Sequence, residues 1–286
     1  MGPGSREEVA ADWRATEPDH DARVAVLPDG RVVGWAALAD RGLHAGLRGQ
    51  AHVHPDVEGR GVAGVLVRWT EERAAGHAPL APEGIRVVLH HECHAEDARA
   101  RGLFRALGYR EIRRVWGMRI GLDPAHPPAA PARPDGIAVR AAAAQAFRDT
   151  WGHVPRTFEQ WVGGKKRHGH DPELWLSALD GDEIAGALAG AILPQTRGWI
   201  HTVAVRRPWR RGLAMALLRE AFRRLAERGA STVALGVDAT SPTGATRLYE
   251  QAGTRVTQEF VVDERELRPG VAPGWGEGRD ERRSAG

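Results

Sequence analysis

Two short basic turns, each containing glycine, carry the residue types best suited to binding an anion. One lies in VRRPWRRGLA, residues 205–214, and the other in EGRGVAG, residues 58–64. A helix is expected after each turn, and the first amide groups of a helix have no hydrogen-bond partner within it. Glycine lets an anion approach the backbone, and arginine adds paired donors that suit phosphate. One such turn is as well explained by solvent exposure, but two copies in the same context favour a pyrophosphate site.

The two turns belong to an internal repeat whose offset is about 150 residues, as from Gly61 to Gly212. Each copy begins with a β-hairpin, at residues 28–38 and 179–190, where Asp-Gly lies between two apolar runs. Each continues as strand, turn and helix, at 48–74 and 197–229, and then as strand, short helix and strand. This order predicts an α/β fold with a mixed sheet in each copy.

A proline-rich segment at residues 121–136 separates the copies, and its prolines disfavour both a helix and a central strand. The end of the chain is rich in glycine, arginine and glutamate, which is typical of disorder. We therefore expect one domain in residues 1–120, a stiff linker at 121–136, a second domain in 137–263 and a flexible tail at 264–286.

The composition excludes several classes of function. A net charge of only +3, with acids and bases evenly mixed, argues against nucleic-acid binding. No apolar run approaches the ~18 residues that span a membrane, and the first residues, MGPGSREEVAADWR, contain no secretory apolar region. The single cysteine, Cys93, fits a reducing cytoplasm.

Neither turn matches a common nucleotide motif, since no G-x-x-x-x-G-K-[ST] is present and the first strand-to-helix turn follows antiparallel strands. The chain instead resembles the GNAT superfamily of N-acetyltransferases, whose acetyl-CoA loop follows R/Q-x-x-G-x-G/A. Further similar text is DTWGHVPRTFEQW at 149–161 and SPTGATRLYE at 241–250. The resemblance covers residues 22–120 and 137–263, and the duplication is similar to the tandem branch that includes mycothiol synthase.

The resemblance implies two tandem GNAT-like domains, each a mixed, mostly antiparallel sheet flanked by helices, with the N-terminal copy incomplete. It also implies that the fourth and fifth strands of a domain splay apart. The pantetheine arm of acetyl-CoA, or of another acyl-CoA, lies in that gap and pairs with the fourth strand. In the second copy this strand is GWIHTVAV, residues 198–205.

Cofactor-binding residues implied by the resemblance fall in both copies. In the second copy they are Val203, Ala204, Val205, Arg210, Arg211, Gly212, Leu213, Ala214, Met215 and Ser241, and in the first they are Gly59, Arg60, Gly61, Val62, Ala63 and Gly64. Each loop departs from the family pattern at one position. Trp209 and Glu58 stand where the family has arginine or glutamine three residues before the glycine.

The chemistry of acyl transfer requires a base and an acid, because an amine must lose a proton and the departing thiolate gains one. Tyr249 occupies the position where many members of the superfamily place a hydroxyl facing the sulfur, so it is the candidate acid. His201 is the candidate base, since period-two alternation puts it on one strand face with Trp199, Val203 and Val205. The alternatives are that Tyr249 only packs, that His201 is a core histidine, and that water carries the proton.

The acceptor expected from the resemblance is a primary amine of a small molecule. Trp151, His153 and Arg156 are its candidate contacts, with Trp161 also available, although the tryptophans are equally suited to a core. Phe104 replaces the tyrosine in the first copy, which is therefore expected to be non-catalytic.

Two functional hypotheses remain open at this point. The chain is either an acyl-CoA-dependent N-acetyltransferase, acting as a monomer or homodimer, or a non-catalytic CoA-binding or scaffolding protein. HHECH, residues 90–94, lacks the spacing of the helix-borne H-E-x-x-H motif, so no metal is expected.

Overall fold

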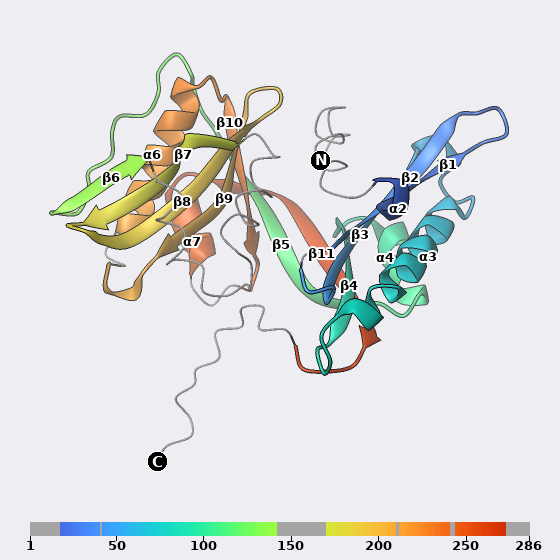
Figure 1. Cartoon of the computed structure of the whole chain (residues 1–286). Coiled ribbons are helices and arrows are strands. Elements are labelled where there is room, and N and C mark those ends of the chain that lie inside the picture. Colours follow the sequence, from blue (N-terminus) through green and yellow to red (C-terminus); the bar gives the residue numbers. More distant parts are fainter. Residues whose placement is uncertain (1–17, 41, 142–169, 210–211, 241–243, 273–286) are drawn as a thin grey trace.

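The computed structural model describes residues 18–40, 42–141, 170–209, 212–240 and 244–272. Within these ranges the strands form one continuous sheet in the order β1-β2-β3-β4-β11-β5-β10-β9-β8-β7-β6. The α/β class is confirmed, and the two copies of the repeat lie at opposite ends of the sheet, each with its own helices (Figure 1). The sheets expected for two separate domains are thus joined into one.

The first copy follows the order that the repeat predicts. Its elements are α2 (Pro18–Asp21), β1 (Ala22–Val26), β2 (Val32–Asp40), β3 (Gly46–Val53), η1 (Pro55–Val57), α3 (Val62–Ala75), η2 (Ala78–Leu80), β4 (Val87–His94), α4 (Ala98–Ala106) and β5 (Arg110–Gly121). Of the predicted linker at residues 121–136, Gly121 ends β5, and residues 122–136 contain neither helix nor strand.

The second copy repeats this order after one additional strand. Its elements are β6 (Ile137–Ala141), β7 (His170–Asp180), β8 (Glu183–Leu193), β9 (Arg197–Val205), η4 (Arg207–Trp209), α6 (Leu213–Glu227), β10 (Thr232–Asp238), α7 (Ala245–Gln251) and β11 (Arg255–Arg268). β6 pairs with β7, as β1 pairs with β2, and among the described residues of the first copy no strand precedes β1.

Paired glycines allow the long helix of each copy to lie close to its sheet. A Cβ on Gly186 of β8 would come within 3.0 Å of the Ala204 carbonyl oxygen and 3.3 Å of a Leu217 methyl group on α6. A Cβ on Gly34 of β2 would come within 3.0 Å of Leu66 on α3 in the same way. The equivalence of Gly34 and Gly186 expected from the repeat therefore has a packing cause.

The final strands of the two copies are exchanged. β5 of the first copy pairs antiparallel with β10, from Thr232–Gly121 to Asp238–Val115, whereas β11 of the second copy pairs antiparallel with β4. β5 and β11 also pair with each other, at the centre of Figure 1. The predicted boundaries at 120 and 137 thus describe the repeat along the chain, while in space each copy is completed by a strand of the other.

The flexible tail does not begin at residue 264, because β11 continues to Arg268. Glu264 forms an ion pair of 2.7 Å with Arg86 and lies 3.0 Å from His90 Nε2, and Arg268 donates to the Pro82 and Ile85 carbonyl oxygens. These partners lie in the first copy, between 174 and 186 residues earlier in the chain. Composition predicted disorder here because it does not reveal partners so distant in sequence.

A buried carboxylate holds the C-terminal half of α6 in a fixed charge arrangement. The side chain of Glu220 is only 1% exposed and accepts hydrogen bonds from Arg223 and Arg224. The Arg223 and Arg224 guanidinium groups lower the Glu220 pKa to about 2, against the opposing effect of burial. Two arginines thus compensate the desolvation of one buried charge.

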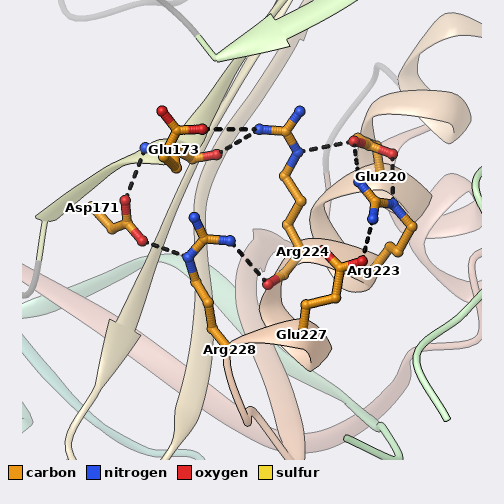
Figure 2. A network of polar contacts seen from close by, with 7 residues as sticks. All are labelled: Asp171, Glu173, Glu220, Arg223, Arg224, Glu227 and Arg228. Carbon is orange, nitrogen blue, oxygen red and sulfur yellow. Dashed lines mark hydrogen bonds and ion pairs between the residues drawn. The ribbon is translucent and has the colours of Figure 1, made fainter.

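Arg224 and Arg228 also tie α6 to the start of β7 (Figure 2). Arg224 donates to the Glu173 carbonyl oxygen at 2.9 Å, and Arg228 Nε donates to Asp171 Oδ2 at 2.6 Å. These contacts fix the helix against the strand that it covers.

Candidate active site

A gap opens between the two parallel strands β9 and β10. Their ladder runs from Arg197–Thr232 to Ile200–Leu235 and ends there, although β9 continues to Val205 and β10 to Asp238. The first copy has the same opening, since β3 and β4 pair only from Gly46–Val88 to Arg48–His90. The splayed strands implied by the resemblance are therefore present in both copies.

Hydrogen-bond alternation shows which backbone groups of β9 face this gap. The Arg206 N–H donates to the Ala185 carbonyl oxygen of β8 at 2.9 Å. In an antiparallel pair the bonded positions recur every second residue, so Ala204 also directs its backbone toward β8. Val203, between bonded positions, directs its N–H and C=O toward the gap. Of the strand residues predicted to bind the cofactor, Val203 has the orientation for pantetheine pairing, and Ala204 does not.

His201 is the extra residue of a β-bulge. β8 and β9 pair Ala189 with Thr202 and Gly190 with Ile200, so β9 contains one more residue than β8 at this point, and that residue is His201. A bulge redirects its side chain and is over-represented beside active sites. The His201 ring lies 6.5 Å from the Trp199 ring, measured between centroids.

The bulge makes one part of the sequence prediction wrong. Ile200 lies in the core cluster with the residues of α6, and Val205 also faces α6, because both Val205 and Leu217 lie against Gly186. Trp199, next to Ile200, therefore points to the opposite face. Trp199 and Val205 do not share a face as expected, since the inserted residue His201 shifts the alternation between them.

The glycine turn of the second copy forms an open helix N-terminus. Gly212 is the N-cap of α6, with φ +80°, and no side chain caps the helix. The first helical hydrogen bond runs from Ala216 N to Gly212 O at 3.1 Å, so the N–H groups of Leu213, Ala214 and Met215 precede it. A Cβ on Gly212 would meet no atom within 4 Å. Among the described residues, the turn thus presents three amide donors that precede the first helical hydrogen bond, with no atom close to Gly212, and this arrangement fits a pyrophosphate.

The first copy presents the same arrangement. Gly61 is the N-cap of α3 with φ +82°, and Val65 N donates to Gly61 O at 3.2 Å, so the amides of Val62, Ala63 and Gly64 precede the first helical bond. Gly59 also has positive φ, +75°, with open space around it. Both predicted turns therefore have the geometry of an anion site, whereas Arg210, Arg211 and Ser241 lie outside the described residues.

Trp209 and Glu58, the two residues that depart from the family pattern, each interact with another side chain. Trp209 Nε1 donates to Asp180 Oδ2 at 2.9 Å, and the Arg206 guanidinium lies 5.0 Å above the Trp209 ring, which anchors the turn to the β7–β8 hairpin. In the first copy the Glu58 carboxylate forms an ion pair with Arg99 at 2.5 Å. Trp209 is a positioning residue that sequence reasoning missed, because its partner precedes it by 29 residues.

Tyr249 lies on α7, and its side chain packs against the same core cluster that Val203 and Val205 border. Burial raises the pKa of its phenol, so the hydroxyl keeps its proton at neutral pH. A protonated hydroxyl is the form that a general acid requires. The corresponding Phe104 of the first copy is 5% exposed and packs in a purely structural role against His91 and Tyr109.

One histidine of HHECH, His91, lies in the core of the first copy. His91 is 2% exposed, lies 3.0 Å from Thr70 Oγ1 through Nε2, and has its pKa lowered to about 3 by burial. Cys93 is also buried, and burial raises its pKa to about 12. Neither group is placed for metal binding or nucleophilic chemistry.

The predicted acceptor contacts Trp151, His153 and Arg156 lie outside the described residues, as does Trp161. The strand that follows them in the chain is β7, which Arg224 and Arg228 of α6 contact at its start. In the parts of the chain that the structure describes, no helix is long and apolar enough to cross a membrane.

The family assignment agrees with this geometry. Residues 3–109 and 138–254 match the model of the Acetyltransferase (GNAT) family. The chain belongs to this family, and it is an acyl-CoA-dependent N-acetyltransferase built from two tandem GNAT regions.

Three individual proteins that are similar to the chain are also named as acetyltransferases. Mycothiol acetyltransferase of Streptomyces scabiei (strain 87.22) is 30% identical over 254 residues, covering 82% of this chain and 75% of that protein. Mycothiol acetyltransferase of Streptomyces bingchenggensis (strain BCW-1) is 31% identical over 234 residues, covering 74% and 70%. A GCN5-related N-acetyltransferase from Sphaerobacter thermophilus superposes with a TM-score of 0.82 at 38% identity, covering 94% of this chain and 87% of that one.

Proposed function

We propose that the second copy transfers the acetyl group of acetyl-CoA to the primary amine of a small molecule. The observation that carries the proposal is the gap between β9 and β10, which lies between the bulged His201 and the open N-terminus of α6. Such a gap admits an extended chain that pairs with the Val203 backbone, while the α6 amides hold a pyrophosphate. Acetyl-CoA combines these two features in one molecule.

In this proposal His201 accepts the amine proton, directly or through water, and the amine nitrogen then attacks the thioester carbonyl. The carbon–sulfur bond breaks, and Tyr249 donates its proton to the departing CoA thiolate. The Tyr249 phenol, whose pKa is raised by burial, is protonated at neutral pH, which is the form that the acid role requires. The bulge at His201 supports the base role, because bulges change the direction of a side chain and are over-represented beside active sites.

The names of the relatives guide the choice of acceptor. We propose a mycothiol-related amine as the first to test, with Trp151, His153 and Arg156 as its contacts. The single buried cysteine fits a reducing compartment, and we place the protein in the cytoplasm.

The proposal is tested by measuring CoA thiol release from acetyl-CoA with a panel of small amines. Cys93 is buried with a raised pKa, so it adds little background to a thiol reagent. We expect amine-dependent release with one preferred acceptor, and propionyl-CoA as a comparison identifies the preferred acyl group. Tight CoA binding without turnover on any amine would overturn the proposal.

The first copy is proposed to bind a cofactor without catalysis. Its turn at Gly59–Gly64 has the anion-site geometry, but Phe104 replaces the phenol. We expect CoA binding at this turn to be unaffected by Tyr249→Phe. Equilibrium dialysis measures the number of CoA molecules bound per chain. A value of one would contradict the proposal that the first copy binds a cofactor in addition to the second copy.

A further inference from the structure

Three potential metal ligands meet at the end of the first copy opposite its glycine turn. Asp40 ends β2, His44 lies in the turn before β3, and His77 follows the C-terminus of α3. His44 Nδ1 is 3.0 Å from Asp40 Oδ2 and 3.0 Å from His77 Nδ1, and the three ligand atoms all lie within 4.8 Å of one another. The 14-residue α3 separates them from Gly61 by about 20 Å.

The protons of neutral histidines cannot satisfy this arrangement. His44 Nδ1 carries either one hydrogen or one lone pair in the ring plane. If it carries the hydrogen, that hydrogen is shared between Asp40 and His77. If it carries the lone pair, His77 can donate to it, but the lone pair then faces the Asp40 carboxylate at 3.0 Å. Asp40 Oδ2, His44 Nδ1 and His77 Nδ1 thus compete for one proton. A bound cation, in contrast, can be coordinated by all three atoms at once.

The spacing suits a small divalent ion. Ligands at the ~2.0–2.1 Å typical of zinc stand about 3.3 Å apart around a tetrahedron, and the two 3.0 Å separations are within a few tenths of that value. His77 is only 6% exposed and lies directly beyond the C-terminal end of the α3 dipole, where positive charge is favoured. The Arg73 guanidinium, a positive group that acts on His77, is paired with Asp21 at 2.7 Å.

The turn itself holds His44 in position. Leu43 and His44 have φ of 60° and 53°, as a two-residue hairpin turn requires. Gln195 and Thr196 adopt the same conformation in the second copy. The backbone is therefore set by the turn, and the first copy alone places a histidine on it.

We propose that Asp40, His44 and His77 bind one divalent ion of the zinc class, with water as a fourth ligand, which fastens the β2–β3 turn to α3. Two imidazoles and one carboxylate match the ligand preference of Zn²⁺ and disfavour Mg²⁺ and Ca²⁺. No metal was expected from the sequence, because His44 and His77 lie 33 residues apart and form no spaced motif.

The test is titration of the full chain, freed of metal by a chelator, with Zn²⁺ in a calorimeter and with Co²⁺ in a spectrophotometer. We expect one high-affinity equivalent, a tetrahedral Co²⁺ absorption spectrum and a melting temperature about 5 °C higher with saturating Zn²⁺. His44→Gln and Asp40→Asn should each weaken Zn²⁺ binding by about 100-fold or more. Both residues are accessible enough for the variants to fold, unlike His77.

The matched control is His126→Gln. His126 forms an exposed pair with Asp123 at 2.8 Å but has no third ligand among the described residues. This variant should keep the wild-type affinity. Zinc affinity unchanged in His44→Gln, an octahedral Co²⁺ spectrum, or the absence of a saturable equivalent would each overturn the proposal.

Discussion

Tyr249 and His201 are the two residues on which the proposed chemistry depends, and each is defined by a different kind of evidence. The proposed role of Tyr249 rests on its position in SPTGATRLYE and on its packing against the core cluster that Val203 and Val205 border. The role of His201 rests on the strand bulge, which the sequence does not reveal. The chain has a second tyrosine and several further histidines, so both roles can be tested against matched substitutions.

Replacing Tyr249 with phenylalanine should lower kcat by about 100-fold while the Kd for acetyl-CoA stays within about threefold, because only the proton donor is lost. Steady-state kinetics and calorimetry separate the two effects. Tyr109→Phe is the control, since Tyr109 is also a buried tyrosine but lies in the first copy, away from the gap between β9 and β10. Equal kcat values in the two variants would remove Tyr249 as the acid.

Replacing His201 with glutamine should lower kcat/KM by about 100-fold near neutral pH, because a general base is lost. The defect should shrink at high pH, where more of the free amine is already deprotonated. The pH profile of kcat/KM measures this. His52→Gln, on β3 of the first copy, should match the wild type, and a parallel loss at every pH would indicate a structural role for His201 instead.

Burial of His91 makes stability depend on pH. Its pKa is about 3 when folded, against 6.5 for an ordinary histidine, so the unfolded chain binds the extra proton between these values. Stability from this residue is therefore complete above pH 6.5 and falls by at most about 1.4 kcal/mol per unit as the pH drops toward 3. Urea unfolding at pH 7 and pH 5 measures the slope. His91→Gln should flatten it, and the exposed His126→Gln should leave it unchanged.

The turn between β9 and α6 is the element that joins the gap to the pyrophosphate site. Its glycine is required twice, for the positive φ of the N-cap and for the open space above the amides. Trp209 and Arg206 hold the turn against the β7–β8 hairpin, so a tryptophan at the family's arginine position does not disrupt the geometry.

Gly212→Ala should raise the KM for acetyl-CoA by about tenfold or more, because a Cβ would enter the space proposed for the pyrophosphate. The substitution also strains the backbone by about 1–2 kcal/mol. Gly84→Ala controls for this strain, since Gly84 has φ +74° and equally open surroundings but lies outside the site. If both variants change KM alike, the effect is strain and not exclusion of the cofactor.

At the scale of the whole molecule, the exchange of β5 and β11 makes each copy depend on the other. Glu264 and Arg268 of β11 bond to the first copy, while β5 completes the sheet beside β10. We therefore expect the two copies to unfold together, and neither half to fold when expressed alone.

Truncation after Asp263 should destabilise the chain by several kcal/mol relative to truncation after Ala272, because it removes the Glu264–Arg86 pair and the Arg268 contacts. Denaturant unfolding followed by circular dichroism gives the difference. Equal unfolding free energies for the two truncations, or two separate transitions in the full chain, would contradict the interdependence of the copies.

Much of this protein is determined locally in the sequence. The hairpins follow from Asp-Gly turns, the open N-termini of α3 and α6 from Gly61 and Gly212, and the repeat from matched spacing, because each depends on residues only a few positions apart. The tertiary structure decided what depends on distant partners. It placed β11 against β4, put a bulge at His201, paired Trp209 with Asp180 and brought His44 to His77. Strand register and side-chain contact are set by packing across the whole sheet, which local residue patterns do not encode.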